Sequence, residues 1–170
     1  IQHLPDGNLH VKIVAAGSEA VLSIKDTDGK VYVVNPGENV NELSAEIGRG
    51  LSPWGYAINE VWITNRSSVS RLKLLAERIP VSGVLLTSNV YQSGADQQPV
   101  HIPAEIPSVK LQSSGIIQYP SGLQILAAAE SIENTALYLT YGDIRVLIPN
   151  GVDFALIRRT ITPTICFLSD

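Results

Sequence analysis

The chain has 170 residues, of which 45% are hydrophobic and 16% are charged, and its formal net charge is −4. This size and apolar content suit one folded domain with a sizeable core, while the acidic balance excludes a dedicated, strongly basic nucleic-acid-binding domain. One cysteine, Cys166, excludes an internal disulfide, and no apolar run reaches the roughly 18 residues that span a bilayer. The chain contains no methionine, so we expect it to be a segment of a longer protein.

Three strands are predicted near the amino terminus. β-Branched residues are concentrated at 10–16, 19–25 and 30–34. Asp-Thr-Asp-Gly at 26–29 indicates a hairpin turn between the second and third runs, because Gly29 can adopt a positive φ at little cost. A helix is then predicted from Asn39, since Glu42 follows three residues later, and two glycines end it near residue 50.

A strand, a helix and a second strand are predicted in the middle of the chain. The strand covers 57–64, the helix 67–79 and the second strand 81–87. Apolar residues recur along the helix at the helical spacing and should face the core. They are Val69, Leu72, Leu75, Ala76 and Ile79. Pro80 then ends the helix, because proline cannot continue it.

Residues 88–107 are rich in Ser, Gly, Gln, Asp and Pro, and we predict a loop there between two halves of a single domain that covers 1–170. In the second half, five short strands, a short helix and a final strand are expected. They cover 108–112, 115–119, 123–129, 134–140, 143–148, 152–159 and 164–168. This pattern favours a mixed α/β (α+β) fold in which two sheets pack face to face with helices outside. The second half has less helix than such a sandwich normally has, so the sandwich is expected to be shortened there.

The turn that leaves the strand at 57–64 is the most informative part of the chain. In α/β proteins, metals and substrates collect at turns that follow the carboxyl ends of strands. Residues 64–70 are Thr-Asn-Arg-Ser-Ser-Val-Ser and offer amide, hydroxyl and guanidinium groups, without imidazole or carboxylate. Divalent transition metals require carboxylate, neutral imidazole or thiolate donors, so we expect no metal to bind in this turn.

Polar side chains near this turn allow two interpretations. Ser67, Ser68 and Ser70 could include a nucleophile, but one of them is expected to cap the helix, as serine commonly does. The basic residues of the helix are expected to form a solvated face, with contact to DNA phosphates or to a partner protein as the alternatives. These basic residues include Arg66, Arg71 and Lys73.

Two further residues are expected in the core. Trp62 lies between apolar residues of a predicted strand and should pack in the core rather than stack on bases, and Cys166 should be a small buried residue of the last strand. Acidic residues at 26, 28, 38 and 42 are expected at turns and helix starts, since their spacing fits no known calcium-binding loop.

Four stretches of the chain, at 4–11, 17–22, 28–37 and 134–148, occur in an order typical of one fold family. A strand leads into a small turn, a hairpin follows, and Asn-Thr-Ala-Leu-Tyr-Leu-Thr-Tyr-Gly-Asp opens the last stretch. The pattern resembles metallo-β-lactamase-fold domains and is most similar to the soluble domain of ComEC-type competence proteins, which are membrane channels for DNA uptake. The resemblance implies an αββα sandwich that belongs to a membrane protein and lies on the extracytoplasmic side.

The residues that bind the metal in that family are different in this chain. The family's motif Thr-His-x-His-x-Asp-His falls on 64–70, and two further aspartates are expected after the third strand and after the strand at 143–148. The six positions concerned carry Asn35, Asn65, Ser67, Val69, Ser70 and Gly151. In intact members, the resemblance implies, a metal-bound hydroxide is the nucleophile. Amide, hydroxyl and aliphatic groups at these positions predict a domain with no catalytic residue, no metal ligand and no cofactor.

The favoured hypothesis is therefore a non-catalytic, metal-free domain of a ComEC-like DNA-uptake membrane protein, with a structural or DNA-guiding role. Its expected partners are the rest of that protein and single-stranded DNA, whose backbone would meet Arg66, Arg71 and Lys73. No small-molecule substrate is expected. One alternative is a hydrolase or nuclease with a displaced metal site, and another is a protein-interaction module. The displaced ligands would come from Glu19, His101, Asp143 and Asp153.

Overall fold

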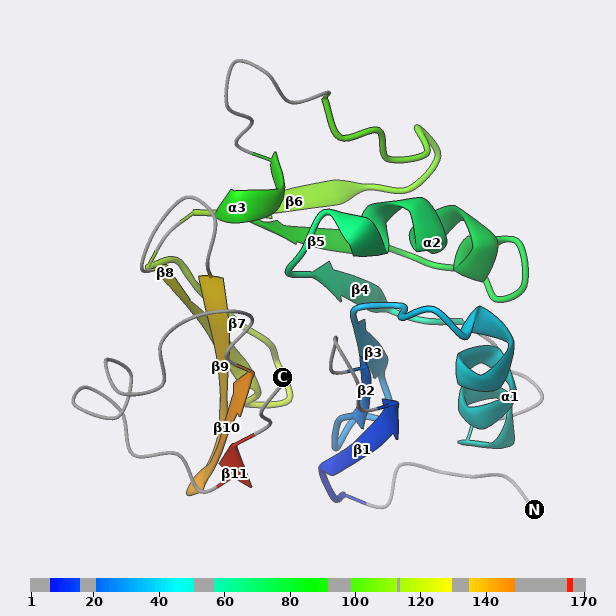
Figure 1. The fold of residues 1–170 in the computed structure, drawn as a ribbon. Helices are drawn as coiled ribbons and strands as arrows, with labels where there is room; N and C mark the ends of the chain where they lie inside the picture. Colours follow the sequence, from blue (N-terminus) through cyan, green and yellow to red (C-terminus); the bar gives the residue numbers. More distant parts are fainter. Residues whose placement is uncertain are drawn as a thin grey trace.

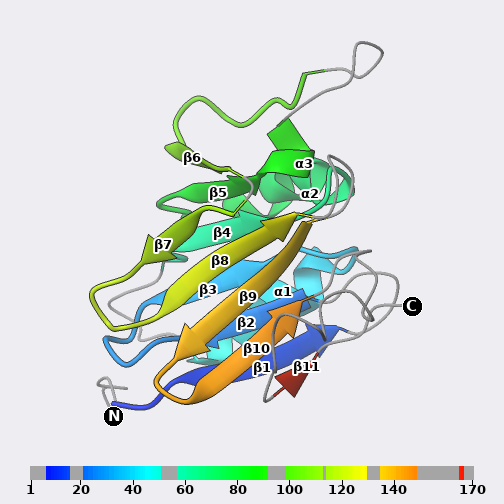
Figure 2. The same ribbon diagram turned by 90° about the vertical axis from the view of Figure 1, so that its left-hand side faces the viewer.

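Two β-sheets pack face to face in this protein, and helices cover the outer face of the first sheet (Figure 1). The computed structural model describes residues 7–15, 21–50, 57–91, 99–112, 114–129, 135–148 and 165–166. In this part of the chain, the first sheet has the strand order β1-β2-β3-β4-β5-β6 and the second has the order β11-β10-β9-β8-β7. Figure 2 shows the second sheet in front of the first. The predicted two-sheet architecture is confirmed.

The first sheet begins with antiparallel strands and continues with parallel ones. Its strands are β1 (His10–Ala15), β2 (Val21–Lys25), β3 (Val31–Val34), β4 (Glu60–Ile63), β5 (Val84–Thr87) and β6 (Ser108–Leu111). β1, β2 and β3 pair antiparallel, and the turn before β3 places Gly29 at a φ of 80°, as the hairpin prediction requires. β3, β4, β5 and β6 pair parallel. Parallel neighbours need long crossovers, and helices supply the first two.

Three helices are described, and all belong to the half of the chain that forms the first sheet. They are α1 (Val40–Gly50), α2 (Ser67–Ala76) and α3 (Ser88–Tyr91). Asn39 caps α1, because its Oδ1 accepts the backbone N–H of Glu42 at 3.1 Å and its Nδ2 donates to the Glu42 carboxylate at 3.0 Å. α2 begins where the sequence predicts but ends at Ala76 rather than at residue 79, because a turn covers 77–79. Of its predicted inward residues, Leu72 and Leu75 are buried, while Val69 and Ala76 are half-buried. α3 is a correction, since it lies inside the segment predicted as a loop.

The second sheet consists of short strands, and in the described part of the chain tight turns lie at 119–123 and 142–143. Its strands are β7 (Ile116–Gln118), β8 (Gln124–Ala129), β9 (Thr135–Tyr141), β10 (Ile144–Ile148) and β11 (Ile165–Cys166). All neighbours pair antiparallel except β10 and β11. The strand predicted at 108–112 pairs with β5 of the first sheet, so the chain passes to the second sheet only after Leu111. The helix predicted at 152–159 lies outside the described residues.

Two large apolar clusters form most of the core of the described residues, and a third, small cluster contains Ala136, Tyr138 and Leu147. One large cluster lies between the first sheet and its helices and includes Val33, Ile63 and Leu72, and the other lies between the sheets. Trp62 belongs to the second cluster and is fully buried, which confirms its predicted place in the core. Because β4 is buried on both faces, its carboxyl end is held at a defined position in the sheet.

Candidate functional site at the strand ends

Polar residues follow directly after the carboxyl ends of three adjacent parallel strands. Asn35 follows β3, Thr64 follows β4, and Thr87 ends β5. The register pairs Val34 with Trp62 and Ile63 with Leu86, so these residues meet at the same edge of the sheet. All of them are buried, with at most 2% of their surface exposed. Buried polar groups need partners, and here they find them in one another.

Asn35 is bound to Thr64 through both ends of its amide. Its Nδ2 donates to Thr64 Oγ1 at 2.8 Å, and its Oδ1 accepts the backbone N–H of Thr64 at 3.0 Å. The backbone N–H of Asn35 also donates to the carbonyl of Trp62 at 3.0 Å. Asn35 has a φ of 51°, a left-handed conformation that asparagine tolerates better than most residues. The amide therefore links the ends of β3 and β4.

A second amide extends this link to β5. Asn89, in α3, donates from Nδ2 to the carbonyl of Thr64 at 2.7 Å. The hydroxyl of Thr87 lies 3.2 Å from the carbonyl of Ile63 and 2.5 Å from Oδ1 of Asn89, and its single hydrogen serves one of them at a time. We call Asn35, Thr64, Thr87 and Asn89 the strand-end network. Its members in 87–89 were missed by the sequence analysis, although Thr-Ser-Asn directly after a buried run was the available signal.

One polar contact also connects the two sheets near this edge. The hydroxyls of Ser88 and Thr135 lie 3.5 Å apart, and Thr135 is the first residue of β9 in the second sheet. Both residues are buried. The carboxyl ends of β3, β4 and β5 thus face the amino end of β9, which places the strand-end network at one end of the sandwich.

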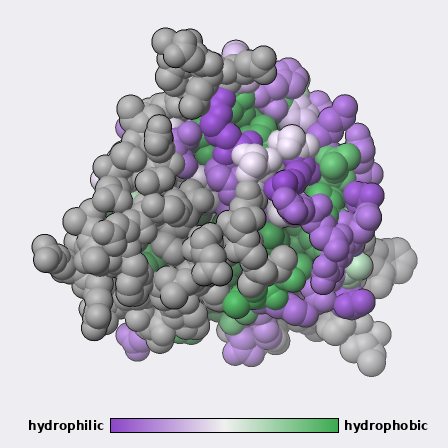
Figure 3. All heavy atoms as spheres, in the orientation of Figure 1, coloured by the Kyte–Doolittle hydropathy of each residue, from purple (hydrophilic) through white to green (hydrophobic). Residues whose placement is uncertain are grey.

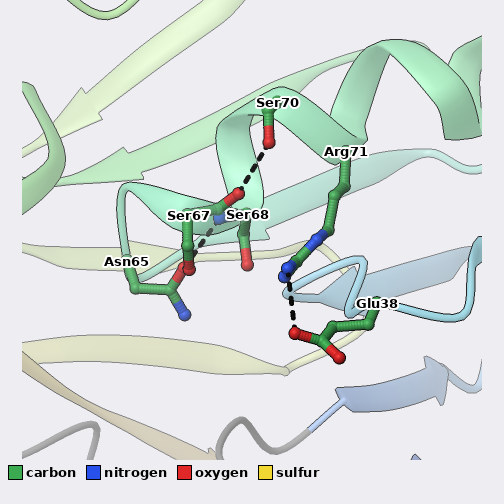
Figure 4. A network of polar contacts seen from close by, with 6 residues as sticks. All are labelled: Glu38, Asn65, Ser67, Ser68, Ser70 and Arg71. Carbon is green, nitrogen blue, oxygen red and sulfur yellow. Dashed lines mark hydrogen bonds and ion pairs between the residues drawn. The ribbon is translucent and has the colours of Figure 1, made fainter.

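Asn65, and not a serine, caps α2 (Figure 4). Its Oδ1 accepts the backbone N–H of Ser68 at 2.9 Å and the hydroxyl of Ser67 at 2.8 Å. The hydroxyl of Ser70 donates to the carbonyl of Ser67 at 3.0 Å. The predicted serine cap is therefore wrong, because the helical geometry already begins at Arg66 and brings Asn65 into the capping position.

The remaining predicted metal-site positions have separate locations. Val69 is half-buried and packs against the cluster between the first sheet and its helices. Gly151 lies outside the described residues. Asn35 thus lies next to Thr64, and Asn65 lies next to Ser67. Both pairs are at the edge of the first sheet where the family resemblance predicts the metal site.

The three basic residues proposed to contact DNA do not share one face of α2. At about 100° per residue, Lys73 lies about 20° from Arg66 around the helix axis, whereas Arg71 lies about 140° away. Arg71 donates to the Glu38 carboxylate at 3.2 Å, and Arg66 donates to the carbonyl of Val90 at 3.1 Å. Lys73 is exposed. Figure 3 shows that hydrophilic residues cover much of the side on which α1 and α2 lie.

The side chains at the strand ends do not fit a divalent transition metal. The described residues contain no group of three or more His, Cys, Asp or Glu side chains that could hold one. Asp143 lies in the turn after β9, whose 7 residues extend roughly 20 Å from Thr135, and so belongs to the opposite end of the sandwich. His101 lines a hollow beside β6. Glu19 and Asp153 lie outside the described residues.

Comparison with solved structures identifies the fold. The chain matches the metallo-β-lactamase fold protein YhfI from Bacillus subtilis with a TM-score of 0.61 and 9% identity, over 94% of this chain and 70% of that one. The chain has the metallo-β-lactamase fold. The chemotaxis sensor ODP in a peroxy diiron state matches with a TM-score of 0.60 and 16% identity, over 88% of this chain. CmlA, a diiron β-hydroxylase from Streptomyces venezuelae, matches with a TM-score of 0.53 and 14% identity, over 94% of this chain.

The chain is shorter than these metal-containing neighbours. It spans 62% of the length of the ODP sensor and 33% of that of CmlA. No family model and no curated protein matches the sequence. Identities this low show the fold alone. Among the described residues, no helix has the length and apolar character needed to cross a membrane.

Proposed function

We propose that this chain is a non-catalytic, metal-free metallo-β-lactamase-fold domain in which side-chain hydrogen bonds take the place of the metal centre. The observation that supports the proposal best is the two-way link between the Asn35 amide and Thr64. It joins the two strand ends from which the family's first metal ligands come. No cofactor or catalytic residue is required for such a role.

The chemistry of the donors favours this interpretation over a weak or unusual metal site. Oδ1 of Asn35 is engaged with the backbone N–H of Thr64, and Oδ1 of Asn65 is engaged with α2. A metal at either oxygen would compete with the backbone N–H that this oxygen already accepts, and a buried N–H that lost its acceptor would cost about 1–3 kcal/mol. Neutral amide and hydroxyl oxygens would contribute little binding free energy to the metal, because they are poor ligands for zinc or iron.

The parent protein is the second part of the proposal. We place the domain in a ComEC-like DNA-uptake membrane protein, on the extracytoplasmic side, where it has a structural or DNA-guiding role. The support is the sequence pattern at 4–11, 17–22, 28–37 and 134–148, together with the fold. DNA contact is expected at the phosphate backbone, with Lys73 as its most accessible cation and Arg66 on the same side of α2.

Metal analysis tests the first part. The purified chain is incubated separately with zinc, manganese and iron(II), desalted, and analysed for each element. We expect far less than one metal per chain and no cleavage of DNA or of a generic phosphodiester. Stoichiometric metal that is lost in Asn35→Ala would overturn the proposal. Stoichiometric metal that survives this change, with activity lost on chelation, would favour the displaced-site hydrolase.

Salt dependence tests the DNA-guiding role. Retention of a single-stranded oligonucleotide should weaken steeply as salt rises from 50 to 200 mM, since phosphate contacts release counterions. Lys73→Gln should reduce retention, and Lys25→Gln, which removes the same charge from β2 in the first sheet, should not. Equal retention of the oligonucleotide by both variants would show that Lys73 does not contact DNA, and it would favour the protein-interaction role.

A further inference from the structure

A hollow of about 390 Å³ lies between β6, α3 and the segment that precedes β6. These elements are side by side in the upper part of Figure 1. Residues from all three line it. Those that the inference uses are Leu86, Tyr91, Val100, His101, Ser108 and Lys110. The volume lies within the roughly 300–1,000 Å³ typical of sites for small ligands.

The floor of this hollow belongs to the folded core. The parallel register pairs Leu86 with Lys110 and Val84 with Ser108, so Lys110 and Ser108 point to the same face of the sheet as the buried Leu86. Tyr91 and Val100 are half-buried and pack against the cluster between the first sheet and its helices. A ligand here would therefore meet a preformed apolar surface.

Lys110 places one positive charge at the rim of the hollow. Lys110 Nζ lies 5.4 Å from the centre of the Tyr91 ring, within the range of a cation–π contact. In the part of the chain that the structure describes, the side chains of His101, Ser108 and Lys110 make no hydrogen bond or ion pair. Among the residues that the structure describes, those that line the hollow include no Asp or Glu. One ammonium, one imidazole and one hydroxyl thus remain available to a ligand on the rim of an apolar floor.

We propose that this hollow binds a small organic anion that has an apolar body. The anionic group, a carboxylate, sulfonate or phosphate, would pair with Lys110 and accept hydrogen bonds from Ser108 and His101, while the apolar body covers Leu86 and Val100. A cation is disfavoured by Lys110. A nucleic acid would need several cations along its backbone, and this hollow has one lysine. The proposal is independent of the metal-free role of the strand ends.

The probe is 8-anilinonaphthalene-1-sulfonate, whose fluorescence reports binding to an apolar surface. Its neutral counterpart, N-phenyl-1-naphthylamine, has the same aromatic body without the sulfonate. We expect the folded chain to bind the anionic probe at one site per chain and more tightly than the neutral probe. Lys110→Gln should weaken the anionic probe about fivefold, as for a partly exposed ion pair, and leave the neutral probe unchanged. Lys25→Gln, with the same loss of charge in β2, should bind both probes as the wild type does.

The variant Ser108→Trp tests whether binding depends on the open volume of the hollow, because it leaves the charge of Lys110 unchanged. The exposed Ser108 points into the hollow, so a tryptophan there fills it and keeps Lys110. We expect this variant to lose both probes while its circular dichroism and unfolding midpoint match the wild type. Equal binding of the two probes, wild-type binding by Lys110→Gln, or retained binding by a folded Ser108→Trp would each overturn the proposal.

Discussion

The two ends of the sandwich satisfy their buried polar groups with different chemistry. At the carboxyl ends of β3, β4 and β5, neutral amides and hydroxyls bind one another, and Asn35 and Thr64 are the central pair. At the opposite end, where β3 and β4 begin, carboxylates accept hydrogen bonds from aromatic side chains and from backbone N–H groups. The carboxylates of Asp26 and Glu60 thus lie at the end of the first sheet opposite to the strand-end network.

The carboxylate end is built around three aromatic rings. Tyr32 lies 5.1 Å from Trp62 and 5.0 Å from Tyr119, measured between ring centroids. Asp26 is 1% exposed and accepts the hydroxyl of Tyr32 at 3.0 Å. The Glu60 carboxylate accepts a hydrogen bond from Nε1 of Trp62 at 2.8 Å and another from the hydroxyl of Tyr119. Since Tyr119 belongs to the second sheet's half of the chain, this contact ties the two sheets together.

The comparison teaches that a carboxylate in this fold need not be catalytic. Asp26 and Glu60 have their oxygens directed at structural donors, in positions that no family motif includes. Asn35, at the position where the family resemblance expects a carboxylate, has a side chain that both donates and accepts. An amide both donates and accepts, so it can close the gap between two strand ends by itself, whereas an ionised aspartate could only accept.

The largest effect is expected from Asp26→Ala. This change leaves the backbone N–H groups of Asp28 and Lys30 and the hydroxyl of Tyr32 without their acceptor. We expect a loss of about 3–5 kcal/mol in the free energy of unfolding, measured by urea denaturation. Asp26→Asn retains an acceptor oxygen and is the control, with a loss less than half as large. Equal losses in the two variants would show that charge, and not hydrogen bonding, governs this end.

A slightly smaller effect is expected from Asn35→Ala at the other end. The variant loses both hydrogen bonds to Thr64 and must hold alanine at a positive φ. We expect about 2–4 kcal/mol of destabilisation in the same urea measurement. Asn35→Asp is the informative partner. Burial raises the pKa of a carboxyl without a cation, so the stability of this variant should be highest at acidic pH and fall as pH rises toward 7. If the unfolding free energy of Asn35→Asp did not change with pH, the site would tolerate a buried negative charge, which contradicts its description here.

The tyrosines of the carboxylate end predict a loss of stability in alkali. Burial and the adjacent carboxylates, Asp26 and Glu60, raise the pKa of Tyr32 and of Tyr119 above the usual 10. The unfolded chain therefore releases these protons first as pH rises past about 10. The free energy of unfolding should fall there by up to about 1.4 kcal/mol per pH unit for each tyrosine. The double variant Tyr32→Phe/Tyr119→Phe should show a shallower slope in urea melts between pH 9 and 12, and an unchanged slope would refute this assignment.

The smallest effect is expected at the surface pair between α2 and the start of α1. Glu38 is 82% exposed at its side chain, and its contact with Arg71 is open to solvent. Glu38→Gln should change the unfolding free energy by less than about 0.5 kcal/mol. Thermal melts at low and high salt check this. A loss above 1 kcal/mol would contradict the description of this pair as a solvent-exposed contact.

Local patterns predicted most of the elements. The start of α2 at Ser67 and its buried Leu72 and Leu75 follow from apolar spacing, and the hairpin before β3 follows from Gly29. These features depend on residues that are close in sequence. The helix cap shows the limit of such patterns, because serine and asparagine compete for the same position and only the backbone geometry decides between them.

Long-range pairings could not be predicted in this way. Asn89 binds Thr64 across 25 residues, and Asn35 binds it across 29. Nothing local to 87–89 specifies these partners, and residues 88 and 89 were assigned to a loop. The membership of β6 in the first sheet depends likewise on pairing with β5. The interpretation that the six positions expected to bind the family's metal form a lost metal site stays a prediction.

Thermal unfolding with and without zinc tests the central claim most directly. The chain, freed of metal by a chelator and exchanged into clean buffer, is melted alone and with a tenfold excess of zinc. A native site filled at 100 times its dissociation constant would add about 2.7 kcal/mol to the stability, and with it several degrees to the unfolding midpoint. We expect the midpoint to stay where it is, because the strand ends are already joined by Asn35 and Thr64. A saturable rise of several degrees that disappears in Asn35→Ala would contradict the account.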